Sequence, residues 1–149
     1  MKIYADNKKA RFNYEILEEY EAGVALTGPE VKSVRAGQIS LKEAFGTIRG
    51  SEVYLTNAHI SPYKPASGQN QEPTRSRKLL LARSEIDSLI GKLQTKGLTL
   101  IPLEIYDKKG KIKVELGLGR GKKKYDKREV IKNRDQKREL ERDLRSSRK

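Results

Sequence analysis

The last thirty residues, Arg120 to Lys149, constrain the fold most, because they cannot build a hydrophobic core of their own. They carry 14 Lys and Arg against 6 Asp and Glu. Their only apolar side chains are Tyr125, Val130, Ile131, Leu140 and Leu144. Burial of so little apolar surface does not offset the entropy lost on ordering a chain. We therefore expect a folded body over residues 1–119 and a basic tail over residues 120–149 that is disordered on its own.

The charge of the chain predicts a large polyanion as partner. The net charge is +13, of which the tail supplies 14 − 6 = +8 and the body 19 − 14 = +5. A compact body with a cationic extension is typical of RNA-binding proteins. The chain has no cysteine, no apolar stretch near its N-terminus and no apolar run of about 20 residues. These observations predict a soluble, cytoplasmic protein with no membrane partner.

The body is predicted to be mainly β. Lys111 to Leu118 alternates strictly, with Ile112, Val114 and Leu116 on the inward face. We predict six or seven short strands that close into a small antiparallel barrel. The segments assigned are a bent strand or hairpin over 13–26, strands over 44–49, 53–58, 98–106 and 111–118, a loose arm over 1–10 and a surface loop over 59–76. Pro102 predicts a bulge or an edge in its strand.

Two short helices are predicted. The first runs from Pro29 to Gly37, because proline suits the first turn and glycine the end of a helix. Val31 and Val34 should face inward. This turns the polar residues of the helix wholly or partly outward, namely Glu30, Lys32, Ser33 and Arg35. The second should be capped by Ser84 and stopped by Gly97, with apolar residues at helical spacing, namely Ile86, Leu89, Ile90 and Leu93.

The sequence predicts no catalytic residue, no metal site and no cofactor. His59 is the only histidine, and the carboxylates show no metal-ligand spacing. The segment from Gly117 to Lys123 is one residue too short for a phosphate-binding loop and has Lys123 where Ser or Thr is needed. We interpret it as a strand end that glycine makes flexible.

Two surfaces are candidates for RNA contacts. On the first helix, Lys32 and Arg35 would contact RNA while Glu30 accepts hydrogen bonds from bases or ribose; the alternative is an ordinary solvated helix face. In the tail, Tyr125 suits base stacking among cations. The segment from Asp126 onward has helix-forming potential, with Arg134 and Arg138 on one face; the alternative is a charge run that aids solubility.

Six motifs occur in one order along the chain. They are Asn7-Lys8-Lys9-Ala10, Tyr20-Glu21-Ala22-Gly23, Gly28-Pro29-Glu30-Val31-Lys32-Ser33-Val34-Arg35, Asn57-Ala58-His59-Ile60, Arg77-Lys78-Leu79-Leu80-Leu81 and Gly121-Lys122-Lys123-Lys124-Tyr125-Asp126-Lys127-Arg128. Together they resemble the SsrA-binding protein (small protein B) family, the partners of tmRNA. The resemblance implies an oligonucleotide-binding (OB-like) barrel with two or three short helices. It also implies a monomeric, non-catalytic adaptor that binds the tRNA-like domain of tmRNA and delivers it to stalled ribosomes.

The resemblance further implies which residues act. The tmRNA-binding residues would be Glu30, Lys32, Ser33 and Arg35. The residues that act on the ribosome, as the tail becomes helical in the empty messenger path of the decoding region, would be Lys122, Lys123, Lys124, Tyr125, Asp126, Lys127, Arg128, Arg134 and Arg138. The alternative is another OB-type ribosome-associated factor, for initiation or assembly, that binds ribosomal RNA. A nuclease is the less favoured second alternative, because ligand clusters and a plausible base are missing.

Overall fold

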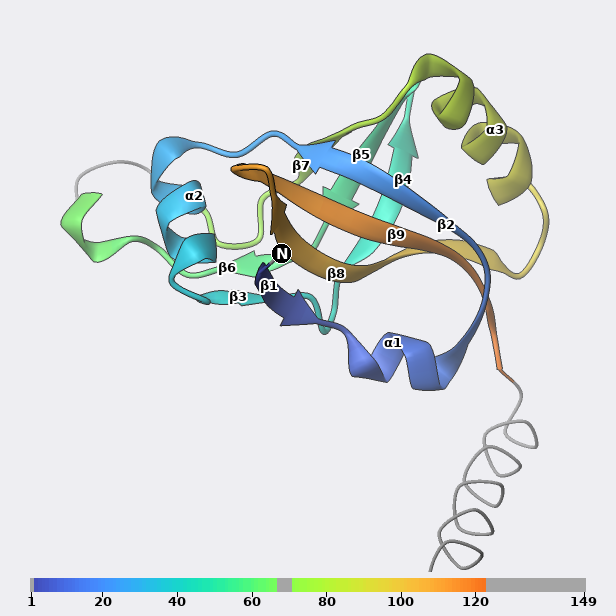
Figure 1. Ribbon diagram of the computed structural model, residues 1–149. Helices are drawn as coiled ribbons and strands as arrows, with labels where there is room; N and C mark the ends of the chain where they lie inside the picture. Colours follow the sequence, from blue (N-terminus) through green and yellow to red (C-terminus); the bar gives the residue numbers. More distant parts are fainter. Residues whose placement is uncertain (1, 67–70, 123–149) are drawn as a thin grey trace, which may run out of the picture.

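The computed structural model describes residues 2–66 and 71–122. Within them the chain forms nine strands, three α-helices and one 3-10 turn (Figure 1). In chain order these are β1 (Lys2–Asp6), α1 (Lys8–Asn13), β2 (Tyr14–Val24), α2 (Gly28–Arg35), β3 (Ile39–Ser40), β4 (Phe45–Arg49), β5 (Glu52–Thr56), β6 (His59–Ile60), η1 (Lys64–Ala66), β7 (Arg77–Leu80), α3 (Arg83–Leu93), β8 (Leu98–Lys108) and β9 (Lys111–Gly121).

The strands form a closed antiparallel barrel, as predicted. Their order is β1-β8-β4-β5-β7-β2-β9, and a further pairing of β8 with β9 closes a ring of six strands. β1 is added to the far half of β8, beyond the point where Gly46 of β4 meets Leu100. β3 and β6 form a separate two-stranded sheet. The prediction of a mainly β chain with a few short helices is therefore confirmed.

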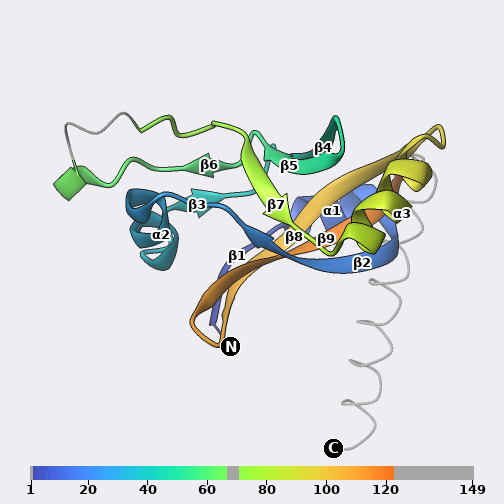
Figure 2. The same cartoon turned by 90° about the horizontal axis from the view of Figure 1, so that it is seen from above.

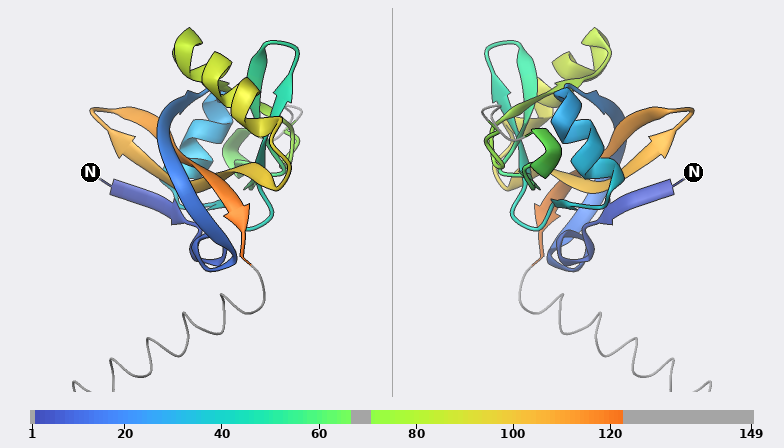
Figure 3. Two further views of the ribbon diagram at one scale, coloured as in Figure 1. Left: turned by 90° about the vertical axis from the view of Figure 1, so that its right-hand side faces the viewer. Right: turned by 90° about the vertical axis from the view of Figure 1, so that its left-hand side faces the viewer.

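The core fills the barrel and extends under two helices. Fully buried side chains come from most strands of the ring, including Val53, Leu55, Leu79, Leu100, Val114 and Leu116. α2 adds Val34 and α3 adds Ile86 and Leu89 to the same cluster. The two helices lie at opposite ends of the strands (Figures 1 and 2), and α2 lies across one end of the barrel (Figure 3). Burial of these apolar surfaces is the main stabilising contribution.

The hairpin of β8 and β9 is the longest feature of the barrel. Its tip has positive φ at Lys109 (52°) and Gly110 (77°), which is typical of a two-residue hairpin turn. The register shifts between Pro102 and Glu104, so the predicted bulge is confirmed. β2 is one continuous strand that is bent by a shift between Ile16 and Glu18, and the hairpin alternative for this segment is wrong.

The expectation of a loose arm over residues 1–10 is wrong, because β1 and α1 occupy this segment. Asn7 explains why. Its side-chain amide donates to the carbonyl oxygens of Leu41 (3.1 Å) and Pro102 (3.0 Å), and its Oδ1 accepts from the N–H of Ala10 (3.2 Å). The buried Asn7 side chain thus bonds this polar stretch to residues far along the chain. The composition of the stretch did not reveal these bonds.

Three smaller expectations also need correction. α3 begins at Arg83 instead of being capped by Ser84, and the Glu85 carboxylate accepts from the Ala82 N–H (3.2 Å). The 59–76 segment contains β6 and η1 among its described residues. The glycines of β9 do not serve flexibility, because a Cβ atom on Gly117 would lie 3.0 Å from Leu103 Cδ1. Gly117 and Gly119 thus allow close packing inside the barrel wall, whereas a Cβ atom on Gly121 would meet no neighbour within 4 Å.

Candidate nucleic-acid interface

α2 begins and ends where its sequence predicts. Thr27 Oγ1 accepts from the Glu30 N–H (3.4 Å), and Glu30 Oε1 accepts from the Thr27 N–H (2.9 Å). This reciprocal pair is a capping box, and Pro29 lies in the first turn. After Arg35 the chain turns at Gly37, where φ is +77°. The local sequence therefore fixes the helix that carries the predicted tmRNA-binding residues.

Glu30 is buried, so the expectation that it points outward is wrong. Its Oε2 atom accepts from Arg75 Nε (3.0 Å) and from Arg77 Nε (2.6 Å). Its Oε1 atom also pairs with Arg75 Nη2. Together with the Thr27 amide these donors occupy both carboxylate oxygens. The side chain is thus engaged within the protein, and a direct contact of Glu30 with RNA stays a prediction.

Arg77 is the partner that the sequence reasoning missed. It is fully buried, and its Nη1 and Nη2 donate to the carbonyl oxygens of Ala58 (2.8 Å) and Pro73 (2.9 Å). The Glu30–Arg77 pair therefore joins α2 to β7 and to the 59–76 segment. The alternation of β7 offered a signal, because Arg77 lies in phase with Leu79, whose side chain faces the core.

Electrostatics keep this pair ionised. Burial by itself would raise the pKa of the Glu30 carboxyl, but the hydrogen bonds that it accepts, first those from Arg75, outweigh burial and hold that pKa below its ordinary value. Burial lowers the pKa of the Arg77 guanidinium, which still stays charged because arginine is so basic. A charged, hydrogen-bonded pair inside a protein positions the elements that it links.

Ser33 is also buried, contrary to expectation, and its hydroxyl donates to the carbonyl oxygen of Ser61 (2.7 Å). It therefore ties the middle of α2 to the residues that follow β6. As for Glu30, its predicted contact with RNA stays a prediction.

Lys32 and Arg35 are exposed on α2, as expected. Lys32 Nζ lies 5.4 Å from the centre of the Tyr63 ring. Arg35 Nη2 donates to the Gly110 carbonyl oxygen (3.1 Å), and its Nε lies 3.9 Å from Asp107 Oδ2. Half of the Arg35 side chain is nevertheless exposed (49%). The two cations thus present charge at the surface, Lys32 beside Tyr63 and Arg35 beside the tip of the β8–β9 hairpin.

A groove of about 380 Å³ separates α2 from the hairpin of β8 and β9. Its apolar walls include Val24, Leu26, Val31, Leu80 and Ile112, and its cations are Arg35, Lys111 and Lys113. Leu80 is 52% exposed, because it lies on the face of β7 opposite to the fully buried Leu79. Apolar surface beside cations suits RNA, because bases pack on the former and phosphates bind the latter. The sequence reasoning missed Leu80, although strict alternation along β7 would have placed it outside.

The charge changes sign further along the outer face of the barrel. Glu115 of β9 lies opposite Glu21 of β2 and opposite Glu104 of β8. A hydrogen bond with Glu19, then burial and the charges of Glu19 and Glu104, raise the pKa of Glu115 to about 7. Such a carboxylate patch repels phosphate. It therefore bounds the cationic surface formed by α2, the groove and the hairpin tip.

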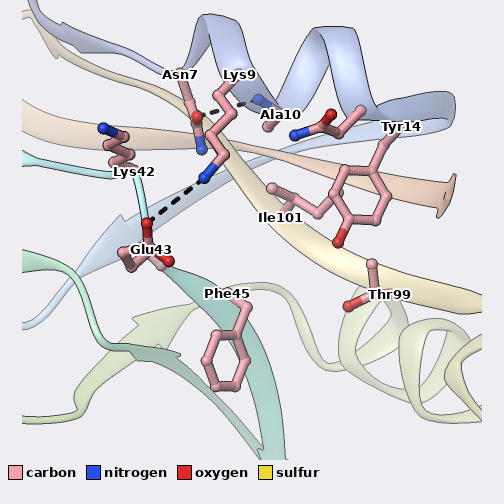
Figure 4. A pocket seen from close by; sticks show the side chains of 11 residues that line it. Asn7, Lys9, Ala10, Tyr14, Lys42, Glu43, Phe45, Thr99 and Ile101 are labelled. Atoms are coloured by element: carbon pink, nitrogen blue, oxygen red, sulfur yellow. Dashed lines mark hydrogen bonds and ion pairs between the residues drawn. The ribbon is translucent and has the colours of Figure 1, made fainter. Parts of the chain in front are cut away.

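A second hollow of about 380 Å³ lies between α1 and the start of β4 (Figure 4). The rings of Tyr14 and Phe45 line it, and Lys9 Nζ lies 3.6 Å from Glu43 Oε1. Next to this region the Lys122 N–H donates to the Asn13 carbonyl oxygen (2.8 Å). Arg120 and Gly121, which were expected in the tail, lie in β9, and Lys122 is the only residue predicted to act on the ribosome that the structure describes. The others, Lys123, Lys124, Tyr125, Asp126, Lys127, Arg128, Arg134 and Arg138, lie outside the described residues.

Within residues 2–66 and 71–122, no group of three or more His, Asp or Glu side chains could hold a metal ion. No helix of this described part is long and apolar enough to cross a membrane. His59 is exposed on β6, opposite Ser40 of β3.

Comparison with known proteins gives one consistent result. The family model described as "SmpB protein" matches residues 4–146. The SsrA-binding protein of Trichodesmium erythraeum is 56% identical over 142 residues, which cover 95% of this chain and 91% of that protein. The SsrA-binding protein of Acaryochloris marina is 57% identical over 145 residues, which cover 96% and 94%.

A solved structure that resembles this chain points to the same family. It is described as "tmRNA-SmpB: a journey to the center of the bacterial ribosome" and has a TM-score of 0.68 and 47% identity. The similarity covers 88% of this chain and 95% of that one.

Proposed function

The chain belongs to the SmpB protein family, and on this premise we propose that it is a non-catalytic RNA-binding adaptor of trans-translation. It binds the tRNA-like domain of tmRNA and delivers it to stalled ribosomes in the cytoplasm. The observation that carries this function is the match over nearly the whole chain to SsrA-binding proteins and to an SmpB chain described with tmRNA and the ribosome.

The surface made by α2, the groove and the tip of the β8–β9 hairpin binds tmRNA. Lys32, Arg35 and the groove lysines Lys111 and Lys113 reach phosphates, because they are the cations gathered there. Leu80 offers apolar surface to a base or a ribose. Glu30 and Ser33 act by holding α2 in place, since their polar atoms bond to the protein itself.

The basic tail acts on the ribosome instead of on tmRNA. Residues 123–149 carry 12 Lys and Arg against 6 Asp and Glu, and their pattern predicts a helix that forms along phosphates. This tail occupies the empty messenger path, where its cations and Tyr125 meet ribosomal RNA. This division of roles between a folded body and a basic tail is based on the sequence, in which the last thirty residues supply +8 of the net charge of +13.

Competition binding tests the proposed function. Labelled tRNA-like domain of tmRNA, bound to the full chain, should resist an excess of ribosomal RNA fragments of equal length. If about 6–10 phosphates are contacted, the affinity should fall about 10³- to 10⁵-fold between 50 and 200 mM salt. Ribosomal RNA that competes as well as tmRNA itself would instead identify a general ribosome-associated factor.

A further inference from the structure

Tyr63 lies beside α2 but does not belong to the hydrophobic core. Both described core clusters include partly buried tyrosines, such as Tyr4 and Tyr14, yet neither includes Tyr63. Its hydroxyl has no hydrogen-bond partner among the described residues, and no buried side-chain polar atom there lacks a partner. The hydroxyl edge of the ring therefore faces solvent, and core packing does not explain the aromatic side chain.

The backbone that carries this ring is held firmly. The Tyr63 N–H donates to Gln71 Oε1 (2.7 Å), and Gln71 Nε2 donates back to the Tyr63 carbonyl oxygen (3.2 Å). Two residues earlier, the Ser61 N–H donates to the Gln38 carbonyl oxygen (3.0 Å), and the Ser61 carbonyl accepts from Ser33. A ring on so constrained a backbone loses little conformational entropy when a ligand binds.

The neighbour of the ring is a cation of the proposed tmRNA surface. Lys32 Nζ lies 5.4 Å from the ring centre, within the range of a cation–π contact. Aromatic rings beside lysines suit unpaired nucleotides, because the base stacks on the ring and the phosphate pairs with the ammonium group.

We propose that Tyr63 and Lys32 form a stacking platform for an unpaired base of the bound RNA. The platform extends the tmRNA surface from α2 onto the segment after β6, so this inference rests on the proposed function. Stacking tolerates any base, since each has a π face. The platform therefore adds affinity and fixes the position of a single-stranded nucleotide without reading its identity.

Binding of the tRNA-like domain of tmRNA to full-length variants tests the platform. Tyr63→Leu should weaken binding about 5- to 100-fold, whereas Tyr63→Phe should bind like the parent, because stacking needs the ring and not the hydroxyl. Tyr54→Leu is the matched control: Tyr54 also lies under a cation, with Arg49 Cζ 5.3 Å from its ring, but on β5. It should leave the affinity unchanged.

If Tyr63→Leu folds poorly, a fluorescence measurement on a second variant still tests the platform. The chain contains no tryptophan, so Tyr63→Trp carries a single indole. Its emission should be quenched when tmRNA binds, while Tyr54→Trp should stay unchanged. Affinity of Tyr63→Leu within about twofold of the parent, or binding of Tyr63→Trp without quenching, would overturn the platform alone. Failure of the parent protein to bind tmRNA would overturn the proposed function, and the platform with it.

Discussion

A protein that ends at Lys122 will bind tmRNA almost as tightly as the full chain but will add no detectable peptide tag on stalled ribosomes. The proposed tmRNA surface lies wholly within the body, so its contacts should survive the truncation. The deletion removes a net charge of 12 − 6 = +6, and only the non-specific, salt-dependent part of the affinity should fall. Lys122 is kept because its N–H bonds to the Asn13 carbonyl oxygen and completes the end of β9.

Tagging of a stalled translation product in a reconstituted system, with tmRNA affinity measured in parallel, checks this result. The control is a full-length chain in which residues 123–149 are shuffled, which keeps the composition and the net charge. It should also fail to tag, because the proposed helix depends on the order of its residues. Normal tagging by the truncated protein would refute the division of labour between body and tail.

Replacement of Arg77 by methionine will lower the free energy of unfolding by about 3–5 kcal/mol, because it breaks the buried ion pair and leaves the Glu30 carboxylate with only the partly exposed Arg75 as a charged partner. The matched control is Arg83→Met. Arg83 pairs with Asp87 at the surface (2.9 Å), so its loss should change the free energy of unfolding by about 0–1 kcal/mol. Chemical denaturation of the two variants and the parent measures both values.

A double substitution distinguishes the cost of an unpaired buried charge from the cost of lost side-chain packing. Glu30→Leu with Arg77→Met removes both charges, so it should be less destabilising than Arg77→Met alone. Binding of tmRNA should still weaken in the double variant, because α2 loses its tie to β7. A loss below about 1 kcal/mol for Arg77→Met would show that the pair does not hold α2.

The same network gives a pH dependence with a definite sign. The pKa of Glu30 is lowered in the folded protein, so its contribution to stability is complete above the ordinary carboxyl pKa of 4.5. This contribution is lost as the pH falls through the lowered value. Glu30→Gln should remove that part of the acid sensitivity.

The sequence predicted those parts of the fold in which apolar residues recur at the regular spacing of a strand or a helix, or in which proline and glycine stand at the ends of an element. The alternation of Ile112, Val114 and Leu116 gave the inward face of β9, and Pro29 and Gly37 gave the ends of α2. Closure of the barrel followed from the number of short strands.

The missed features depend on polar groups that find partners far along the chain. Glu30 bonds to residues 45 and 47 positions away, and the Asn7 side chain reaches Pro102, 95 positions away. No local period reveals such partners. Glu30 and Ser33 were therefore assigned to the solvent side, although they hold α2 against the rest of the protein.

The affinity of a charge variant of the α2 surface shows whether this surface binds tmRNA. Lys32→Ala with Arg35→Ala should weaken binding of the tRNA-like domain by about tenfold or more at 150 mM salt. Lys8→Ala with Lys9→Ala removes the same charge from exposed positions of α1 and should change the affinity by less than about threefold. Equal weakening by the two pairs, or unchanged binding by the α2 variant, would show that α2 is not the tmRNA-binding surface.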